Sequence, residues 1–198
     1  MDALFPLNNL SSLATSGKSI LFFGEAMPRL SAYLIGQLAA QGRPITLIDA
    51  ANSFDPYLIA RISRHGDIDP RILLERIHLS RAFTCHQLVT LLCEILPQQS
   101  QRDPLFINGP CNLFYDEQVP LKERKLLFER VAQSLALLGK RGQGLYLFQR
   151  PMVKQVKNLF LGRVLGRYVH LVIRVKSGAQ GLEGLLHQSN LPNRRTEG

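Results

Sequence analysis

Short apolar runs alternate with amphipathic segments along most of this chain. Runs rich in β-branched or aromatic residues predict strands, and apolar residues recurring every three or four positions predict helices. The predicted strands are 20–23, 45–49, 77–82, 105–108, 144–149 and 169–175, and the predicted helices are about 29–41, 56–64, a short one from 69, 86–96 and 121–138. This alternation predicts an α/β fold with a mainly parallel sheet flanked by helices. We expect a single domain over residues 1–192 and a loose tail over 193–198.

The first predicted strand leads through Gly24 into an amphipathic helix, which is the pattern of a nucleotide-binding βα unit. A phosphate-binding loop of this kind reads G-x-x-x-x-G-K-[ST], because backbone N–H groups and a lysine must reach the phosphates. Here Arg29 stands at the second glycine and Leu30 at the lysine, while Ser31 keeps the hydroxyl. The similar-looking segment 16–19 precedes the strand, so we expect it to be a turn at the opposite edge of the sheet.

Positive charge is concentrated in the C-terminal third of the chain. The formal net charge is +9, yet no Asp or Glu occurs between Glu129 and Glu183, a stretch that carries ten Lys or Arg residues. The rest of the chain is close to neutral. A local positive field of this kind favours a polyanion such as nucleic acid over a membrane surface, and a merely solubilising surface is the alternative.

The cysteines and the hydropathy indicate a cytoplasmic protein. Cys85, Cys93 and Cys111 are odd in number and show no C-x-x-C spacing, so reduced thiols are expected and a metal site is not. No apolar run approaches the roughly 18 residues of a membrane span. The acidic Asp2 does not fit the basic start of a signal peptide.

Several short stretches resemble the ATPase core of the RecA/RadA recombinase family, in particular its archaeal–eukaryotic branch. They are Gly17-Lys18-Ser19-Ile20-Leu21-Phe22-Phe23-Gly24-Glu25, residues 48–60 around Ile48-Asp49-Ala50-Ala51, residues 77–88 with the His86-Gln87 pair, and Gln188-Ser189-Asn190-Leu191-Pro192. The resemblance implies a RecA-like fold, interaction with DNA and a tendency to form oligomers.

The same resemblance implies that the catalytic residues are missing. The position of the phosphate-binding lysine holds Leu30, that of the catalytic glutamate holds Ala51, and that of the magnesium-supporting aspartate holds Asn108. A neutral amide holds a hard divalent cation poorly, and phosphoryl transfer depends on positioned charge. The resemblance therefore implies a degenerate nucleotide site formed by Gly24, Arg29, Ser31 and Gln149, with no cofactor, no metal and no ATP hydrolysis. Gln149 stands where the family senses the γ-phosphate, and a structural hydrogen bond at a strand end is the alternative.

In the family, the loop that follows the Gln149 strand meets DNA. Here residues 150–168 contain no acid, and interleave aromatic and basic side chains; the expected phosphate contacts are Arg150, Lys154, Lys157, Arg163 and Arg167. The segment also has helical spacing, so a short helix with a basic outer side is equally compatible with it. Residues 109–120 contain no Lys or Arg and are not expected to contact DNA.

The sequence therefore predicts a catalytically inactive recombinase paralogue. The expected partners are DNA, mainly single-stranded, a recombinase or other repair protein, and further copies in a homo-oligomer or hetero-oligomer; no membrane is expected. Two alternatives stay open: a scaffold or regulatory subunit that binds no DNA, and an ATPase whose site is completed by a partner subunit.

Overall fold

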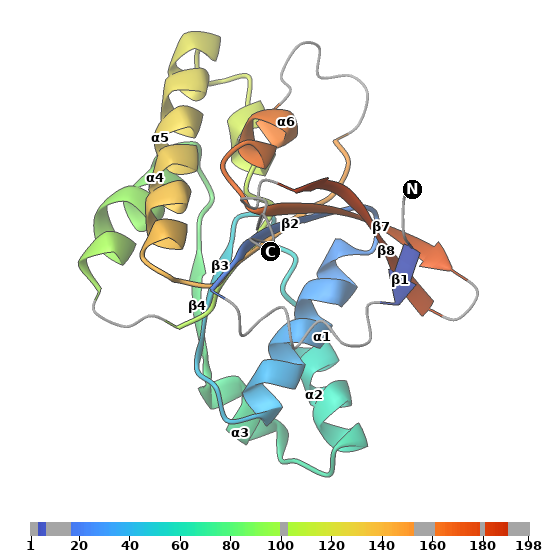
Figure 1. The fold of residues 1–198 in the computed structure, drawn as a ribbon. Coiled ribbons are helices and arrows are strands. Elements are labelled where there is room, and N and C mark those ends of the chain that lie inside the picture. The colour runs from blue at the N-terminus through green and yellow to red at the C-terminus, as the bar shows by residue number, and fades with distance from the viewer. Residues whose placement is uncertain (1–3, 7–16, 100–102, 153–160, 179–180, 190–198) are drawn as a thin grey trace, which may run out of the picture.

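An eight-stranded sheet, mainly parallel, runs through the centre of the molecule (Figure 1). The computed structural model describes residues 4–6, 17–99, 103–152, 161–178 and 181–189. The strand order is β1-β8-β7-β2-β6-β5-β3-β4. The strands are β1 (Leu4–Pro6), β2 (Ser19–Phe23), β3 (Ile45–Asp49), β4 (Ile77–Arg81), β5 (Leu105–Asn108), β6 (Leu145–Gln149), β7 (Leu171–Gly178) and β8 (Gly181–Ser189). Strands β2 to β7 are mutually parallel, and β8 and β1 extend the sheet in antiparallel fashion.

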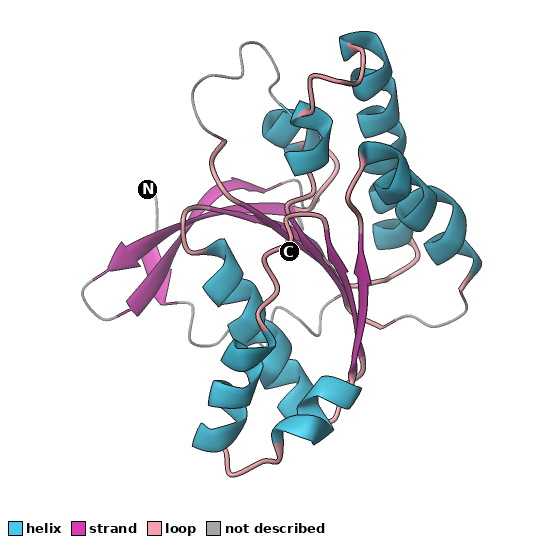
Figure 2. Ribbon diagram, turned by 180° about the vertical axis from the view of Figure 1, so that it is seen from behind, coloured by secondary structure: helices cyan, strands magenta, loops and turns pink. Residues whose placement is uncertain are grey.

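Helices cover both faces of the sheet, as Figure 2 shows from behind. One face carries α1 (Met27–Ala40), α2 (Pro56–His65) and α3 (Pro70–Glu75); the other carries α4 (Cys85–Val89), α5 (Leu121–Lys140) and α6 (Leu161–Gly166), together with the short helical segments η2 (Thr90–Ile95), η3 (Leu96–Gln98) and η4 (Asn112–Tyr115). Successive residues of a strand point to opposite faces, so side chains of the apolar strands pack into two hydrophobic cores, one on each face of the sheet. Ile20 and Phe22 pack toward α1, whereas Leu21 and Leu147 pack toward α5.

Side chains at helix starts explain several element boundaries. Asp55 accepts a hydrogen bond from the Tyr57 N–H at 2.9 Å, and Asp69 accepts one from the Arg71 N–H at 2.9 Å, so both act as N-caps before a proline. The strand order and the two helix layers confirm the predicted α/β class with a mainly parallel sheet. The predicted tail 193–198 lies outside the described residues.

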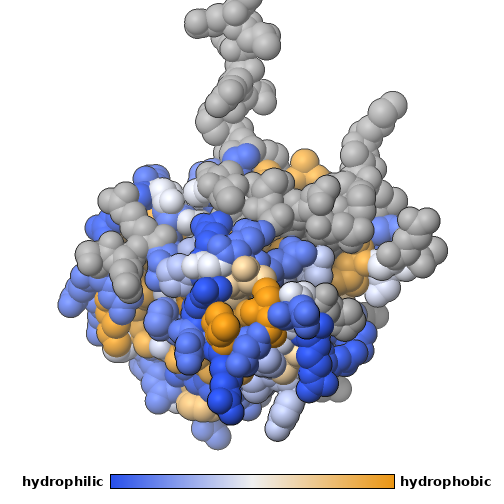
Figure 3. Space-filling view, turned by 90° about the horizontal axis from the view of Figure 1, so that it is seen from below, coloured by the Kyte–Doolittle hydropathy of each residue, from blue (hydrophilic) through white to orange (hydrophobic). Residues whose placement is uncertain are grey.

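The surface near α2 and α3 is mainly hydrophilic, with hydrophobic residues in small separate groups (Figure 3). Among the described helices, none combines the length and the apolar composition needed to span a bilayer. At the edge of the sheet opposite β4, β1 pairs with β8, with Phe5 opposite Gly184.

Candidate functional site

The turn between β2 and α1 is too short to wrap a phosphate group. Gly24 has a φ of +156°, and a Cβ there would lie 2.3 Å from the carbonyl oxygen of Val175, so only glycine fits beside β7. The helix begins at Met27, and the Leu30 N–H already donates to the Ala26 carbonyl at 3.0 Å. Regular helix therefore occupies the positions at which a phosphate-binding loop would present free N–H groups.

Arg29 and Leu30, at the positions that the resemblance assigns to the second glycine and the lysine, differ in exposure. Leu30 is 1 % exposed and packs in the core between α1 and the sheet. Arg29 is exposed on the surface of α1. The position that the resemblance assigns to the phosphate-binding lysine is thus a core position in this fold.

Ser31 and Asn108 lie in direct contact. The Ser31 hydroxyl donates a hydrogen bond of 2.7 Å to the Asn108 side-chain oxygen, and both residues are buried. The bond joins α1 to the carboxyl end of β5. Two neutral groups therefore satisfy each other at the positions that the resemblance assigns to a magnesium-binding hydroxyl and an aspartate.

Side chains fill almost all of the space around this pair. The remaining cavity has a volume of about 20 Å³ and is lined by Met27, Pro28, Ala51, Ser53, Asn108, Gly109, Asn112, Phe148 and Arg150. A volume of that size holds about one water molecule. Gly109 has a φ of +67°, and a Cβ there would lie 2.6 Å from that of Ala51, so the loop after β5 packs against the position that the resemblance assigns to the catalytic glutamate.

Asp49, the buried carboxylate at the end of β3, has a structural role. It accepts hydrogen bonds from the Ser53 N–H at 3.1 Å and the Phe54 N–H at 2.8 Å, and its carboxylate lies 3.8 Å from the Arg81 guanidinium. These contacts hold the loop between β3 and α2.

Gln149 connects two loops at the carboxyl edge of the sheet. Its side-chain oxygen accepts a hydrogen bond from the Cys111 N–H at 3.0 Å, and its amide nitrogen donates to the Asn112 side chain at 2.9 Å and to the Arg150 carbonyl at 2.7 Å. The loop after β5 is thereby held against the loop after β6. These contacts are structural hydrogen bonds at the end of a strand, the alternative that the sequence analysis gave for Gln149.

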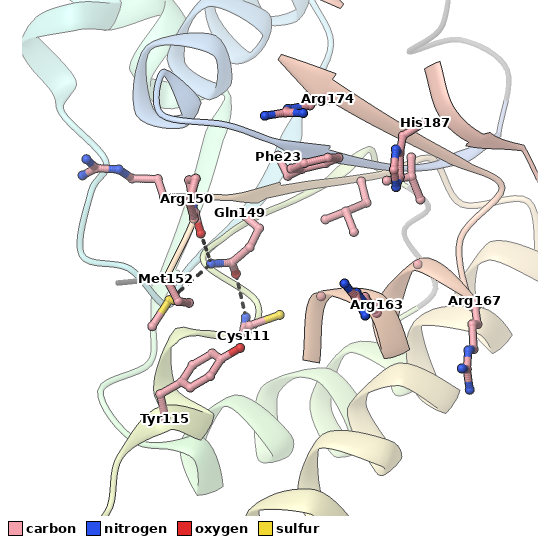
Figure 4. Close-up of a pocket in the computed structure, with 15 residues that line it drawn as sticks. Phe23, Cys111, Tyr115, Gln149, Arg150, Met152, Arg163, Arg167, Arg174 and His187 are labelled. Atoms are coloured by element: carbon pink, nitrogen blue, oxygen red, sulfur yellow. Dashed lines mark hydrogen bonds between the residues drawn. The ribbon is translucent and has the colours of Figure 1, made fainter. Parts of the chain in front are cut away.

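A much larger cavity opens beside Gln149, between α6 and the sheet (Figure 4). Its volume is about 640 Å³, within the roughly 300–1,000 Å³ usual for ligand pockets. It is lined by Leu21, Phe23, Cys111, Tyr115, Gln149, Arg150, Pro151, Met152, Gly162, Arg163, Gly166, Arg167, Val172, Arg174 and His187. None of these is acidic, and five are Arg or His. The cavity thus combines an apolar floor with a cationic rim.

The structure brings together three of the five predicted phosphate contacts. Arg150, Arg163 and Arg167 all line this cavity, although Arg167 extends away from the other labelled basic side chains in Figure 4. The predicted contacts Lys154 and Lys157 lie outside the described residues. Arg150 also lies 3.3 Å from Glu25 of the β2–α1 turn. Both side chains of this pair are mostly exposed, so the ion pair is weak and Arg150 can exchange Glu25 for another anion.

Two lining residues, Arg174 and His187, were not among the predicted contacts. Arg174 follows Val172 by two positions on β7, so the period of a strand places both on the cavity face. This alternation, which is visible in the sequence, could have predicted that Arg174 lies on the cavity face. His187 lies on β8, a strand that the sequence pattern did not predict.

Two further groups that line the cavity, Tyr115 and Cys111, stay protonated at neutral pH. Burial raises the pKa of Tyr115 to about 12, and the Tyr115 hydroxyl bonds to the backbone of Leu161 at the start of α6. Burial also raises the pKa of the Cys111 thiol far above its ordinary value, which makes it a poor nucleophile. The described groups are suited to binding an anion with an apolar part.

No protein-family model matches this chain. The observed fold is α/β with a mainly parallel sheet between two layers of helices.

Proposed function

We propose that this protein is a catalytically inactive relative of the RecA/RadA recombinases that binds DNA through the cationic cavity. The position of the cavity supports the proposal. From β2 the chain crosses to β3 on one side, whereas from the neighbouring β6 it crosses to β7 on the other side, so the connections of these two adjacent strands diverge. Ligands of open α/β sheets bind at such a switch point, beyond the carboxyl ends of the strands. Phe23 and Gln149, which end β2 and β6, both line the cavity.

The observation that carries the proposal is the charge of this cavity. Arg150 after β6, Arg163 and Arg167 of α6 and its C-terminal end, and Arg174 of β7 all line it, and no described lining residue is acidic. Guanidinium groups recognise phosphate oxygens well, because their N–H groups match them in geometry and charge. A polyanionic backbone is therefore the ligand class that this rim fits best.

The absence of catalysis in this proposal is supported by the packing at the degenerate site. Leu30 is buried, Ser31 and Asn108 bond to each other, and the cavity left there has a volume of about 20 Å³. An ATPase completed by a partner would have to open this packing as well as supply the missing charges. Purified protein is expected to hydrolyse no ATP above the blank, with or without DNA. Turnover that Ser31→Ala abolishes would contradict this part of the proposal.

DNA binding is tested by fluorescence anisotropy with labelled single-stranded and duplex DNA over a salt series. The variant changes Arg150, Arg163, Arg167 and Arg174 to Ala. Each phosphate contact on a single strand contributes about 0.7 to the slope of log affinity against log salt. We expect the slope to fall by about 2–3 in the variant, since not every arginine need meet a phosphate.

The matched control removes four positive charges elsewhere, from Arg64, Arg71, Lys122 and Lys125, all of which are exposed. It should keep the wild-type slope within about one contact. An equal loss in both variants would indicate that net charge alone attracts DNA. If the wild-type protein binds no DNA at low salt, the proposal fails, and the scaffold alternative gains support.

A further inference from the structure

The floor of the cationic cavity presents an aromatic surface held in a fixed orientation. Phe23 is opposite Gln149 of β6 and Arg174 of β7 in the strand register, so an amide, an aromatic ring and a guanidinium lie in one row. Phe23 is only partly buried, and its ring meets His187 edge-on at 5.6 Å and 75°. The row is built on adjacent strands of the central sheet, which position these side chains more rigidly than a loop does.

Beneath this row the floor is fully apolar. Leu21 and Val172 are paired neighbours on β2 and β7, and they are 2 % and 5 % exposed. The opposite wall is α6, which carries Arg163 and Gly162. In Figure 4 the labelled Arg163 lies on α6, across the cavity from Phe23. A ligand that fits must therefore have a flat apolar part for the floor and a negative charge for the rim.

A nucleotide unit has both parts, because every base has a π-face and every backbone link has a phosphate. In a duplex the base faces are stacked on their neighbours and cannot reach a floor of this kind. An unpaired residue of a single strand can turn its base away from the stack. Base–aromatic stacking of this type is a known source of affinity that tolerates any sequence.

We propose that the cavity accepts one unpaired nucleotide of a single strand, with its base against Phe23 and its flanking phosphates at the arginine rim. This inference rests on the proposed function, and it adds the source of selectivity for single strands. Phosphate contacts alone would give similar affinity for any nucleic-acid backbone, whereas the cavity adds affinity for a strand whose base is free to leave the stack.

Gly162 offers a way to close the cavity without removing a charge. A Cβ built there meets no atom within 4 Å, and its φ lies outside the left-handed region. Gly162→Leu should therefore extend a side chain into the open space. Leucine also favours a helix more than glycine does, so α6 should keep its structure.

The test compares a thymidine 20-mer with an abasic strand of equal length, which carries the same phosphates and no bases. The wild-type protein should bind the thymidine strand about 5- to 100-fold more tightly. In Gly162→Leu this ratio should fall toward one, while the salt slope stays unchanged. Ala40→Leu is the control, because it adds the same side chain at an exposed position on the opposite face of the sheet.

Equal affinity of the wild-type protein for the two strands would overturn the inference and leave DNA binding intact. An unchanged ratio in Gly162→Leu would overturn it as well. Free thymidine monophosphate should compete only weakly, because it lacks the flanking phosphates. Competition as strong as that of the 20-mer would make a free nucleotide the ligand and reject the strand assignment. Failure of both strands to bind would instead reject the proposed function itself.

Discussion

The Ser31 hydroxyl donates a hydrogen bond of 2.7 Å to the Asn108 side chain, and this bond closes the space between α1 and the carboxyl end of β5. The two residues lie 77 positions apart in the sequence. Ser31 keeps the hydroxyl that the resemblance assigns to magnesium binding, and Asn108 is the neutral counterpart of the aspartate that the resemblance places beside it. Together they form a buried contact that joins α1 to β5, so the amide at position 108 contributes to the stability of the fold.

Removal of this bond should destabilise the protein. Ser31→Ala leaves the buried Asn108 amide without its partner, which should lower the free energy of unfolding by about 1–3 kcal/mol. Urea denaturation followed by circular dichroism measures the change. A second substitution, Asn108→Leu in the Ser31→Ala background, should recover part of the loss, because it removes the unsatisfied group. A cost below about 0.5 kcal/mol for Ser31→Ala would show that water replaces the hydroxyl.

Restoring the phosphate-binding lysine should not restore nucleotide binding. Leu30→Lys places an ammonium group in the core under α1, where Leu30 is 1 % exposed. The variant should lose about 2–4 kcal/mol of stability and gain no affinity for ATP. Leu30→Met, which conserves volume, should cost less than about 1.5 kcal/mol. Denaturation gives the stabilities and isothermal titration the affinity; binding of ATP by Leu30→Lys would contradict the closed site.

Neutralising Glu25 should strengthen DNA binding. Glu25 lies 3.3 Å from Arg150 and competes with phosphate for that guanidinium. Glu25→Gln should raise the affinity for single strands about two- to fivefold at low salt, and the salt slope by up to about 0.7. The control Glu75→Gln makes the same charge change at an exposed position on α3. Equal gains in the two variants would indicate a general charge effect rather than release of Arg150.

Two tyrosines should make the protein sensitive to alkaline pH. Burial raises the pKa of both Tyr115 and Tyr146 to about 12. An unfolded tyrosine releases its proton near pH 10, so the folded chain holds protons that the unfolded chain has lost. Their contribution to stability is thus complete below about pH 10 and disappears as the pH rises toward 12.

Chemical denaturation at pH 9 and at pH 11 checks this expectation. For Tyr146, which is 1 % exposed, the decrease should be on the order of 1 kcal/mol per pH unit within that window. Tyr146→Phe should reduce the decrease. Tyr57→Phe, at a side chain that is 79 % exposed, should leave it unchanged. A wild-type stability that does not depend on pH between 10 and 11 would disprove the effect.

The sequence predicted those elements whose signal is local. The bounds of β3 and β5 match the predicted strands 45–49 and 105–108, because each is a short, mainly apolar run that ends in a polar residue. The helix after β4 was predicted to run regularly over 86–96, and here the structure differs. It widens into the π-helical segment η2, in which the Leu92 carbonyl accepts a hydrogen bond of 2.6 Å from Ser134 of α5. That contact is tertiary and leaves no local signature.

Strand β8 was missed for a related reason. It contains two glycines and a glutamate, with no β-branched residue, and it exists through its pairing with β7. The cationic cavity depends on that pairing, since His187 lies on β8, and on the packing of α6 against the sheet. The contact of Ser31 with Asn108 was not predicted either, because it joins residues 77 positions apart. The same holds for a cavity made by surfaces distant in the chain.

The pairing of β1 with β8 brings Leu4 opposite Leu185, so the first and last described strands complete one edge of the sheet. This edge can form only after β8 has been synthesised, up to Ser189, whereas β2, β3, β5 and β6 are complete once Gln149 has been added. Closing so long a loop has a high entropic cost, and a three-residue strand recovers little of it. The edge is therefore expected to be the last part to fold and the first to exchange its amide hydrogens. A fusion at either terminus would act on this same late-forming edge.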